Sequence, residues 1–276
     1  MICIIFILMF SFSFADLIRP DSGTNLSYIY VPFEWEQEAD VINYNLQIST
    51  QESFNNIVVD IQEPTTVYIE KESLDWDDTY YWRVRPLDSS ENFGEWSEIS
   101  SFTITDKQFP DRDADIYNEA LIQDGLVAFG GFAPNLSSAV IDKYGNEIWN
   151  TGSGEQSEGF IINHINEYGN IYGLSGDDHP NNTGTKINYD LDFIWSAPTT
   201  DPAYAVDIHE IKQIPNGNYM AFVPDYQLGP IPQGDWSFIY QALGYQADGV
   251  TEEYPWIGMR IVEWDEDGNE VWNWDP

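Results

Sequence analysis

The stretch His209–Phe222, with the sequence HEIKQIPNGNYMAF, indicates most about how this chain folds. An apolar, alternating run ends at Ile214, the turn sequence PNGN follows, and a second alternating run begins at Tyr219. Proline presets one backbone dihedral of a turn and Asn-Gly tolerates positive φ, so these runs predict a tight hairpin. His209 lies at the start of this hairpin, at the end opposite the turn.

The composition indicates an all-β protein with a strongly acidic surface. The chain has 276 residues, including 11 Trp, 17 Tyr and 15 Phe, and turn residues recur without helical periodicity. This length gives room for two domains, each with its own core. With 47 acidic and 10 basic residues, the net charge is −37. Such a surface repels nucleic acid and anionic membranes, which we therefore exclude as partners.

The first fifteen residues have the pattern of a secretory signal. Residues 1–15 are apolar and end in Ser13-Phe14-Ala15, where small residues suit signal peptidase. The run is short for a membrane span. We expect cleavage here and a secreted, periplasmic or cell-surface protein with no membrane attachment afterwards. The single cysteine, Cys3, lies inside this signal, so the mature chain has no disulfide, catalytic thiol or cysteine metal site.

Residues 16–105 predict a β-sandwich. About seven short alternating runs occur at regular spacing, with a tryptophan in a central one. The stretch resembles a fibronectin type III domain in Trp35, in Leu74 placed six residues before Tyr80, and in the closing GEWSEISSF. The resemblance implies that Leu74 and Tyr80 form a tyrosine corner, with Tyr80, Trp82 and Val84 on one face. Residues 106–113 are polar, charged and interrupted by proline, which indicates a linker.

Residues 114–276 repeat two turn signals. The first is centred on Gly125, Gly169 and Gly217, and the second occurs in Asp142–Trp149, Asn188–Trp195 and Asp265–Trp272. Each unit therefore holds two hairpins, or four strands in about 40 to 50 residues, which is the period of a propeller blade. Three units are visible, fewer than the four or so that close a propeller. We therefore expect an incomplete, C-terminally truncated propeller.

The third unit contains a long insertion, Tyr226–Ile257, rich in Trp, Tyr, Gly and Pro. Long loops inside compact domains are uncommon and often functional. Because both tight turns of a blade lie on one rim, the insertion and the start of the first strand lie on the opposite rim. The topology therefore predicts that His209, Arg260 and the insertion share one face with His179, which lies in the connecting loop of the preceding unit.

The propeller segment resembles the bacterial arylsulfotransferase family, which are secreted six-bladed propellers. The residues that carry the resemblance are the H-E-I-x-x-I-P-N-G-N motif at His209–Asn218 and the recurring D-x-x-G-N-E-[IV]-W turns. The order of signal, fibronectin-like domain and propeller is also similar to some members. About three of six blades would be present. The resemblance implies transfer of sulfate from a phenolic sulfate ester to a phenol, independent of PAPS and of any cofactor, through a sulfo-histidine intermediate.

The resemblance gives His209 a role in contacting the sulfate or oxyanion. No motif matching the nucleophilic histidine of the family occurs before Pro276. We expect His179 and Arg260 to bind substrate, although a polar loop histidine and an arginine paired with a nearby acid are alternatives. We expect no metal site, because the run from Asp265 departs from calcium-loop spacing and indicates a turn. The alternative function is a non-catalytic secreted propeller that binds glycans or proteins, with the fibronectin-like domain as a spacer.

Overall fold

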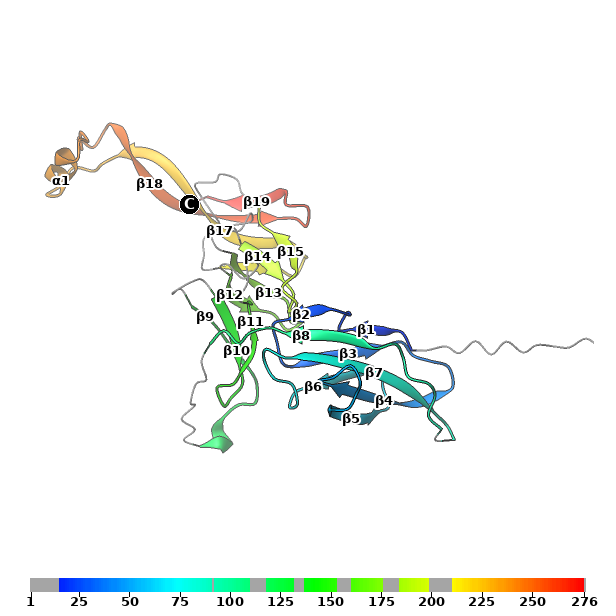
Figure 1. Ribbon diagram of the computed structural model, residues 1–276. Helices are drawn as coiled ribbons and strands as arrows, with labels where there is room; N and C mark the ends of the chain where they lie inside the picture. The colour runs from blue at the N-terminus through cyan, green and yellow to red at the C-terminus, as the bar shows by residue number, and fades with distance from the viewer. Residues whose placement is uncertain are drawn as a thin grey trace, which may run out of the picture. The chain divides into compact units, whose positions relative to one another are not determined.

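The computed structural model describes residues 15–90, 92–109, 118–131, 137–152, 160–175, 184–198 and 210–275. Within these ranges the chain is almost entirely β-structure, with one short α-helix and one 3₁₀ turn (Figure 1). The predicted all-β class is confirmed. The chain divides into two compact units, residues 1–127 with 139–153 and residues 128–138 with 154–276.

The first unit contains a sandwich of two sheets. One sheet has the order β1-β3-β6 and the other has the order β2-β8-β7-β4-β5. All neighbouring strands are antiparallel except β2 and β8. The strands are β1 (Leu17–Arg19), β2 (Thr24–Leu26), β3 (Val31–Trp35), β4 (Val41–Ser49), β5 (Ile57–Glu63), β6 (Val67–Glu70), β7 (Thr79–Asp88) and β8 (Ser100–Ile104).

Aromatic side chains fill the space between the two sheets. Phe33 of β3 meets Trp82 of β7 edge to face, with ring centroids 5.1 Å apart, and Tyr80, Trp82 and Val84 are all buried. Alternation along β7 therefore places these three residues on the core face, as predicted. The tyrosine corner is also confirmed, because the backbone N–H of Asp75 donates to the hydroxyl of Tyr80 at 2.9 Å beside buried Leu74. Burial raises the pKa of Tyr80 to about 12.

Residues 139–153, which contain most of β10 (Ser137–Ile141) and all of β11 (Glu147–Asn150) from the first predicted repeat, belong to this same compact unit. With β9 (Val127–Gly131), these strands form a three-stranded sheet in the order β11-β10-β9. The backbone around β11 exchanges hydrogen bonds with residues 27–29 of the sandwich, at 2.9 and 3.0 Å. The buried carboxylate of Glu147 accepts the backbone N–H groups of residues 108 and 109. These contacts join two segments that the repeat pattern alone treats as separate.

The second unit contains two four-stranded antiparallel sheets in which strands follow one another in chain order. The first has the order β12-β13-β14-β15 and the second β16-β17-β18-β19. The strands are β12 (Phe160–Ile165), β13 (Ile171–Ser175), β14 (Gly184–Ile187), β15 (Phe193–Ser196), β16 (Ile211–Gln213), β17 (Tyr219–Pro230), β18 (Glu252–Trp264) and β19 (Glu270–Trp274).

Five hairpins share one register, in which residue i pairs with residue i+6 across a five-residue loop. The closing pairs are Ile141 with Glu147, Ile165 with Ile171, Ile187 with Phe193, Gln213 with Tyr219, and Trp264 with Glu270. The fourth loop residue always has positive φ, and it is glycine in all cases but Leu191. Glycine adopts this conformation without steric cost, so the predicted hairpin at residues 214–218 and its relatives are confirmed.

The first residue of most of these loops supplies a side-chain cap. Asp142 Oδ1 accepts the backbone N–H of Tyr144 at 2.8 Å and of Asn146 at 2.9 Å, and the side chain of Asn188 makes the equivalent pair of bonds in its own loop. An Asp or Asn at this position therefore fixes the loop by the same local chemistry each time. The loop that begins at Asp265 is a turn of this kind, as predicted.

The two sheets of the second unit pack against each other. A buried cluster contains Tyr172 of one sheet and Tyr219, Val262 and Trp264 of the other. The rings of Trp195 and Tyr219 are stacked, with centroids 3.7 Å apart and planes 7° apart. The contact continues where Gly184 faces Ile211, because a Cβ at Gly184 would lie 2.6 Å from the Ile211 side chain. A glycine in β14 thus allows the sheets to approach closely.

Candidate functional site

The structure places only some of the predicted site residues. His209 and His179 lie outside the described residues. Arg260 lies in β18, where its Nη1 contacts the two carboxylate oxygens of Glu270 at 3.0 and 3.1 Å. The structure therefore gives Arg260 an acidic partner, the alternative considered from the sequence, and any substrate anion must compete with that carboxylate. His164 lies in β12 and stacks on Tyr172, with ring centroids 5.9 Å apart.

The register of the second four-stranded sheet confirms the predicted arrangement of its ends. The loops 214–218 and 265–269 lie at one end, because Tyr219 pairs with Trp264 there. The β17–β18 connection lies at the other end, where Pro230 pairs with Glu252. The insertion thus emerges from the end opposite the tight turns. Strand β16 begins at this same end, at Ile211.

The insertion forms a long two-stranded ribbon in place of an irregular loop. Pairing of β16 stops at Ile211 and that of β19 at Trp274, whereas β17 and β18 stay paired from Pro224–Met259 to Pro230–Glu252. Figure 1 shows this ribbon running beyond its sheet, with helix α1 (Ser237–Ala242) near its far end. We call residues 224–259 the arm.

The far end of the arm is held together by its own side chains. Tyr254 meets Tyr240, Tyr245 and Trp256 edge to face, with centroids 5.4, 5.5 and 5.1 Å apart. The Glu253 carboxylate accepts the backbone N–H groups of residues 246 and 247 at 2.7 and 2.6 Å. These contacts replace the core that a two-stranded ribbon lacks, since such ribbons are marginally stable alone.

The outer surface of the arm is apolar and carries negative charge only. Its exposed large side chains include Leu228 (63% exposed), Phe238 (69%), Leu243 (70%), Val250 (80%) and Ile257 (67%), and α1 has no buried residue. Between residues 224 and 259 the sequence has five acidic residues and no Lys or Arg. Exposed apolar patches of this kind mark interaction sites. The length and composition of the insertion predicted a functional loop, but its extended form did not follow from the sequence.

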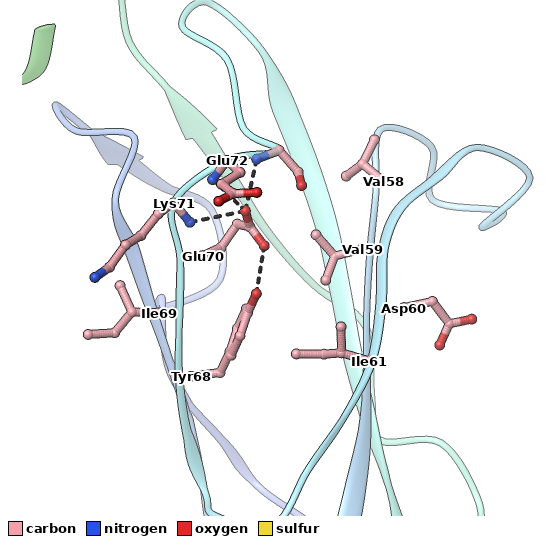
Figure 2. A pocket seen from close by; sticks show the side chains of 10 residues that line it. Val58, Val59, Asp60, Ile61, Tyr68, Ile69, Glu70, Lys71 and Glu72 are labelled. Carbon is pink, nitrogen blue, oxygen red and sulfur yellow. Dashed lines mark hydrogen bonds between the residues drawn. The ribbon is translucent and has the colours of Figure 1, made fainter. Parts of the chain in front are cut away.

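The sandwich contains a pocket of about 440 Å³ between β5 and β6. Figure 2 shows Glu70 inside it, with its carboxylate accepting the N–H groups of Lys71, Glu72 and Ser73 and the hydroxyl of Tyr68 at 2.7 to 3.0 Å. Burial opposes ionisation of Glu70, but these bonds outweigh it and lower the pKa of this carboxyl.

Neither Glu70 nor Tyr68 is suited to proton transfer near neutral pH. Glu70 stays ionised and its oxygens are occupied by the turn that it caps. Burial, followed by the bond to Glu70, raises the pKa of Tyr68 to about 12. A general acid or base works best with a pKa near the operating pH. We therefore assign Glu70 and Tyr68 to the stability of this turn.

Two features are absent from the described residues. These residues contain no group of three or more His, Cys, Asp or Glu side chains placed to hold a metal ion. They also contain no helix of the length and apolar character that a membrane crossing requires.

Comparisons with known proteins identify no family for this chain. No protein-family model matches the chain, and no curated protein is similar to it in sequence. A β-1,2-glucanase from Parabacteroides distasonis is similar in structure with a TM-score of 0.27 and 16% identity, over 34% of this chain and 13% of the glucanase. An α-L-rhamnosidase from Dictyoglumus thermophilum gives 0.26 and 11%, over 91% of this chain and 27% of the rhamnosidase. The chain spans a small part of either enzyme, and likenesses this low carry no functional argument.

Proposed function

We propose that this chain is the N-terminal part of a secreted arylsulfotransferase-like protein, with a fibronectin type III-like module before an incomplete propeller. The observation that carries the proposal is the set of five hairpins with one register, in which the D-x-x-G-N turns and the PNGN turn of the motif share the same geometry. The described part of the motif, residues 210–218, thus includes one of these repeated turns, which supports the proposal.

Two features support the fibronectin-like module. Three strands face a larger sheet in the orders β1-β3-β6 and β2-β8-β7-β4-β5. The tyrosine corner formed by Tyr80 and the N–H of Asp75 adds a feature expected at this position of such sandwiches. We assign this module the role of a spacer.

The sheets of the second unit support the propeller. Each is a four-stranded antiparallel meander, and the two pack face to face through the Trp195–Tyr219 stack. Propeller blades have four strands and pack in this manner around a central axis, and about four or more are needed for closure. Two complete four-stranded sheets and one of three strands are described. We infer that further blades complete a ring of six.

The proposed chemistry uses histidine in two roles. A neutral imidazole from a further blade attacks the sulfur of a phenolic sulfate ester. The N–S bond forms while the S–O bond breaks, and the donor phenolate leaves. The acceptor phenol then attacks the same sulfur, loses its proton, and releases the imidazole. His209 would donate a hydrogen bond to the sulfuryl oxygens or the developing phenolate. His179 would contact the same group, and Arg260 would exchange Glu270 for substrate.

The test is turnover of a chromogenic aryl sulfate with a phenol acceptor, in the protein that carries the remaining blades. His209→Ala should lower turnover roughly a hundredfold, as loss of one oxyanion donor does in other enzymes. His164→Ala is the matched control, because His164 stacks on Tyr172 away from the predicted rim. Wild-type turnover in folded His209→Ala protein would remove His209 from the site.

A second candidate function is a non-catalytic propeller that binds proteins through the arm. The observation that favours it is the uncovered apolar surface that includes Phe238, Leu243 and Val250. The exposed side chains of the arm are aliphatic as well as aromatic, including Trp236 and Trp256, and an apolar patch of this kind suits a protein partner. A folded, complete protein that never turns over an aryl sulfate would favour this function over the transferase.

A further inference from the structure

Two arginines and three aromatic rings form an alternating row on the outer face of the sandwich. The guanidinium carbon of Arg83 lies 3.9 Å from the ring centre of Phe54 and 4.1 Å from that of Trp96. The guanidinium carbon of Arg85 lies 4.3 Å from Trp96 and 3.8 Å from Phe93. Both arginines come from β7, at alternate positions that point away from the core. Both cationic groups thus lie against the same indole ring.

Neutral amides hold the edges of these guanidinium groups. Gln47 Oε1 accepts Arg83 Nε at 3.2 Å and Nη2 at 2.8 Å, and Asn45 Oδ1 accepts Arg85 Nε at 3.1 Å. The amide nitrogens of both side chains donate to Asp60, at 2.7 and 3.0 Å. Asp60 therefore orients the amides so that their oxygens face the arginines. The planes and edges of both guanidinium groups are fixed before any ligand arrives.

In the described part of the chain, Arg83 and Arg85 have no direct carboxylate partner, although so acidic a chain would be expected to supply one. Among the described residues, Arg260 and Lys212 each contact a carboxylate, but Arg83 and Arg85 form no ion pair, although the chain has 47 acidic residues. Burial and then the charge of Arg85 lower the pKa of Arg83, and Asp60 opposes this only in part. The fold thus keeps two like charges together with no carboxylate in direct contact, and the charge of Asp60, behind the amides, compensates only part of their repulsion.

We propose that the Arg83–Trp96–Arg85 row is a binding site for a small oxyanion, a sulfate or a carboxylate. A guanidinium has five N–H donors, of which Arg83 uses two and Arg85 one in the bonds above. The remaining donors are part of a rigid fork that matches oxyanion geometry. An oxyanion here would neutralise the repulsion between the two cations. The aromatic and amide contacts supply the preorganisation that lowers the entropic cost of binding.

The net charge selects a small ligand over a polyanion. A polymer such as a nucleic acid extends over the surface and is repelled by a chain of net charge −37. At physiological ionic strength, exposed charges beyond roughly 8 Å are largely screened. A compact anion therefore responds mainly to the two guanidinium groups that it touches. This site lies in the sandwich and does not depend on the proposed transferase chemistry.

The test is a titration of the whole chain with sodium sulfate, sodium benzoate and phenyl sulfate at constant ionic strength, with sodium chloride as the balancing salt. The arginine Nε–Hε and tryptophan indole resonances are followed by NMR. We expect saturable shifts of Arg83, Arg85 and Trp96. Arg85→Gln should weaken binding about tenfold or more, because charge-assisted hydrogen bonds are lost. Lys71→Gln, which removes the same charge elsewhere in the sandwich, should change it less than twofold. The free sulfate, the carboxylate and the ester distinguish which oxyanion the site accepts.

Arg85→Lys keeps the charge but loses the fork, and it should bind with intermediate affinity. It also shows whether the loss in Arg85→Gln reflects unfolding, since thermal melting of both variants is compared with the wild type. The proposal is overturned if the wild type shows no saturable shift at these resonances. It is equally overturned if Lys71→Gln weakens binding as much as Arg85→Gln does.

Discussion

Substituting Gly173 by alanine should destabilise the second unit severely. Gly173 lies in the middle of β13, where a Cβ would stand 2.0 Å from the carbonyl oxygen of Ile161 and 2.6 Å from the ring of Phe160. Ordinary contacts begin near 3.4 Å. The register of β12 and β13 also shifts nearby, between Ile162 and His164. Backbone cannot rotate away as a flexible side chain would, so the strands must separate.

The loss of stability in Gly173→Ala can be estimated from the contacts and hydrogen bonds that break when β12 and β13 separate. Overpacking alone costs roughly 1 to 3 kcal/mol, and loss of two ladder hydrogen bonds adds about 1 kcal/mol each. We expect a loss of roughly 3 to 5 kcal/mol, a large part of the 5 to 15 kcal/mol that stabilises a typical domain. For a unit of this size, that corresponds to a fall of roughly 10 °C or more in its melting temperature.

The assay is thermal melting combined with amide hydrogen exchange, which separates the two units. The matched control is Gly258→Ala in β18, where an added Cβ would meet only the Asp225 carbonyl at 3.8 Å. That variant should melt within a few degrees of the wild type. If Gly173→Ala melts like Gly258→Ala, the close pairing of β12 and β13 described above is wrong.

Four other predictions concern both units and the start of the chain. Tyr80→Phe leaves a backbone N–H without its partner, so urea unfolding should show a loss of about 1 to 3 kcal/mol. The pKa of Tyr80 and of Tyr68 is raised to about 12 from 10.0, so their contribution to stability should be complete below pH 10 and fall between pH 10 and 12 in melts across that range. A double-mutant cycle of Trp195→Leu and Tyr219→Leu should give a coupling of about 0.5 to 1.5 kcal/mol, whereas additivity would contradict stacking between the sheets. Mass spectrometry of secreted material should find an N-terminus near Asp16, and an intact Met1 in the cytosol would contradict the signal.

The sequence predicted the structure correctly where the determining interactions are between residues close together in the chain. A five-residue loop with Asp or Asn first and glycine fourth closes through its own backbone and side chain, so the hairpins at Asp142 and Asp265 were predictable from a few adjacent residues. Strict alternation along Tyr80, Trp82 and Val84 likewise determined which face of β7 is buried. The tyrosine corner needed only Leu74 and Tyr80, which are close in sequence.

Predictions about the site were more limited. The register places the insertion at the end of the sheet predicted from the order of turns, but His209 and His179 lie outside the described residues. Arg260 was predicted to bind substrate, and the structure pairs it with Glu270. An unpaired arginine and a paired one have the same local sequence, because the partner lies on another strand.

The sequence by itself determined the all-β class, the turns and the alternating core faces of this protein, since each depends on residues a few positions apart. Tertiary structure alone decided that β11 joins the sandwich, that the insertion extends as a ribbon, and that Arg83 and Arg85 stack on Trp96 without a carboxylate. Each of these depends on pairing between distant segments. Several acidic and aromatic residues could have satisfied the same local pattern, and only the packed chain selects among them.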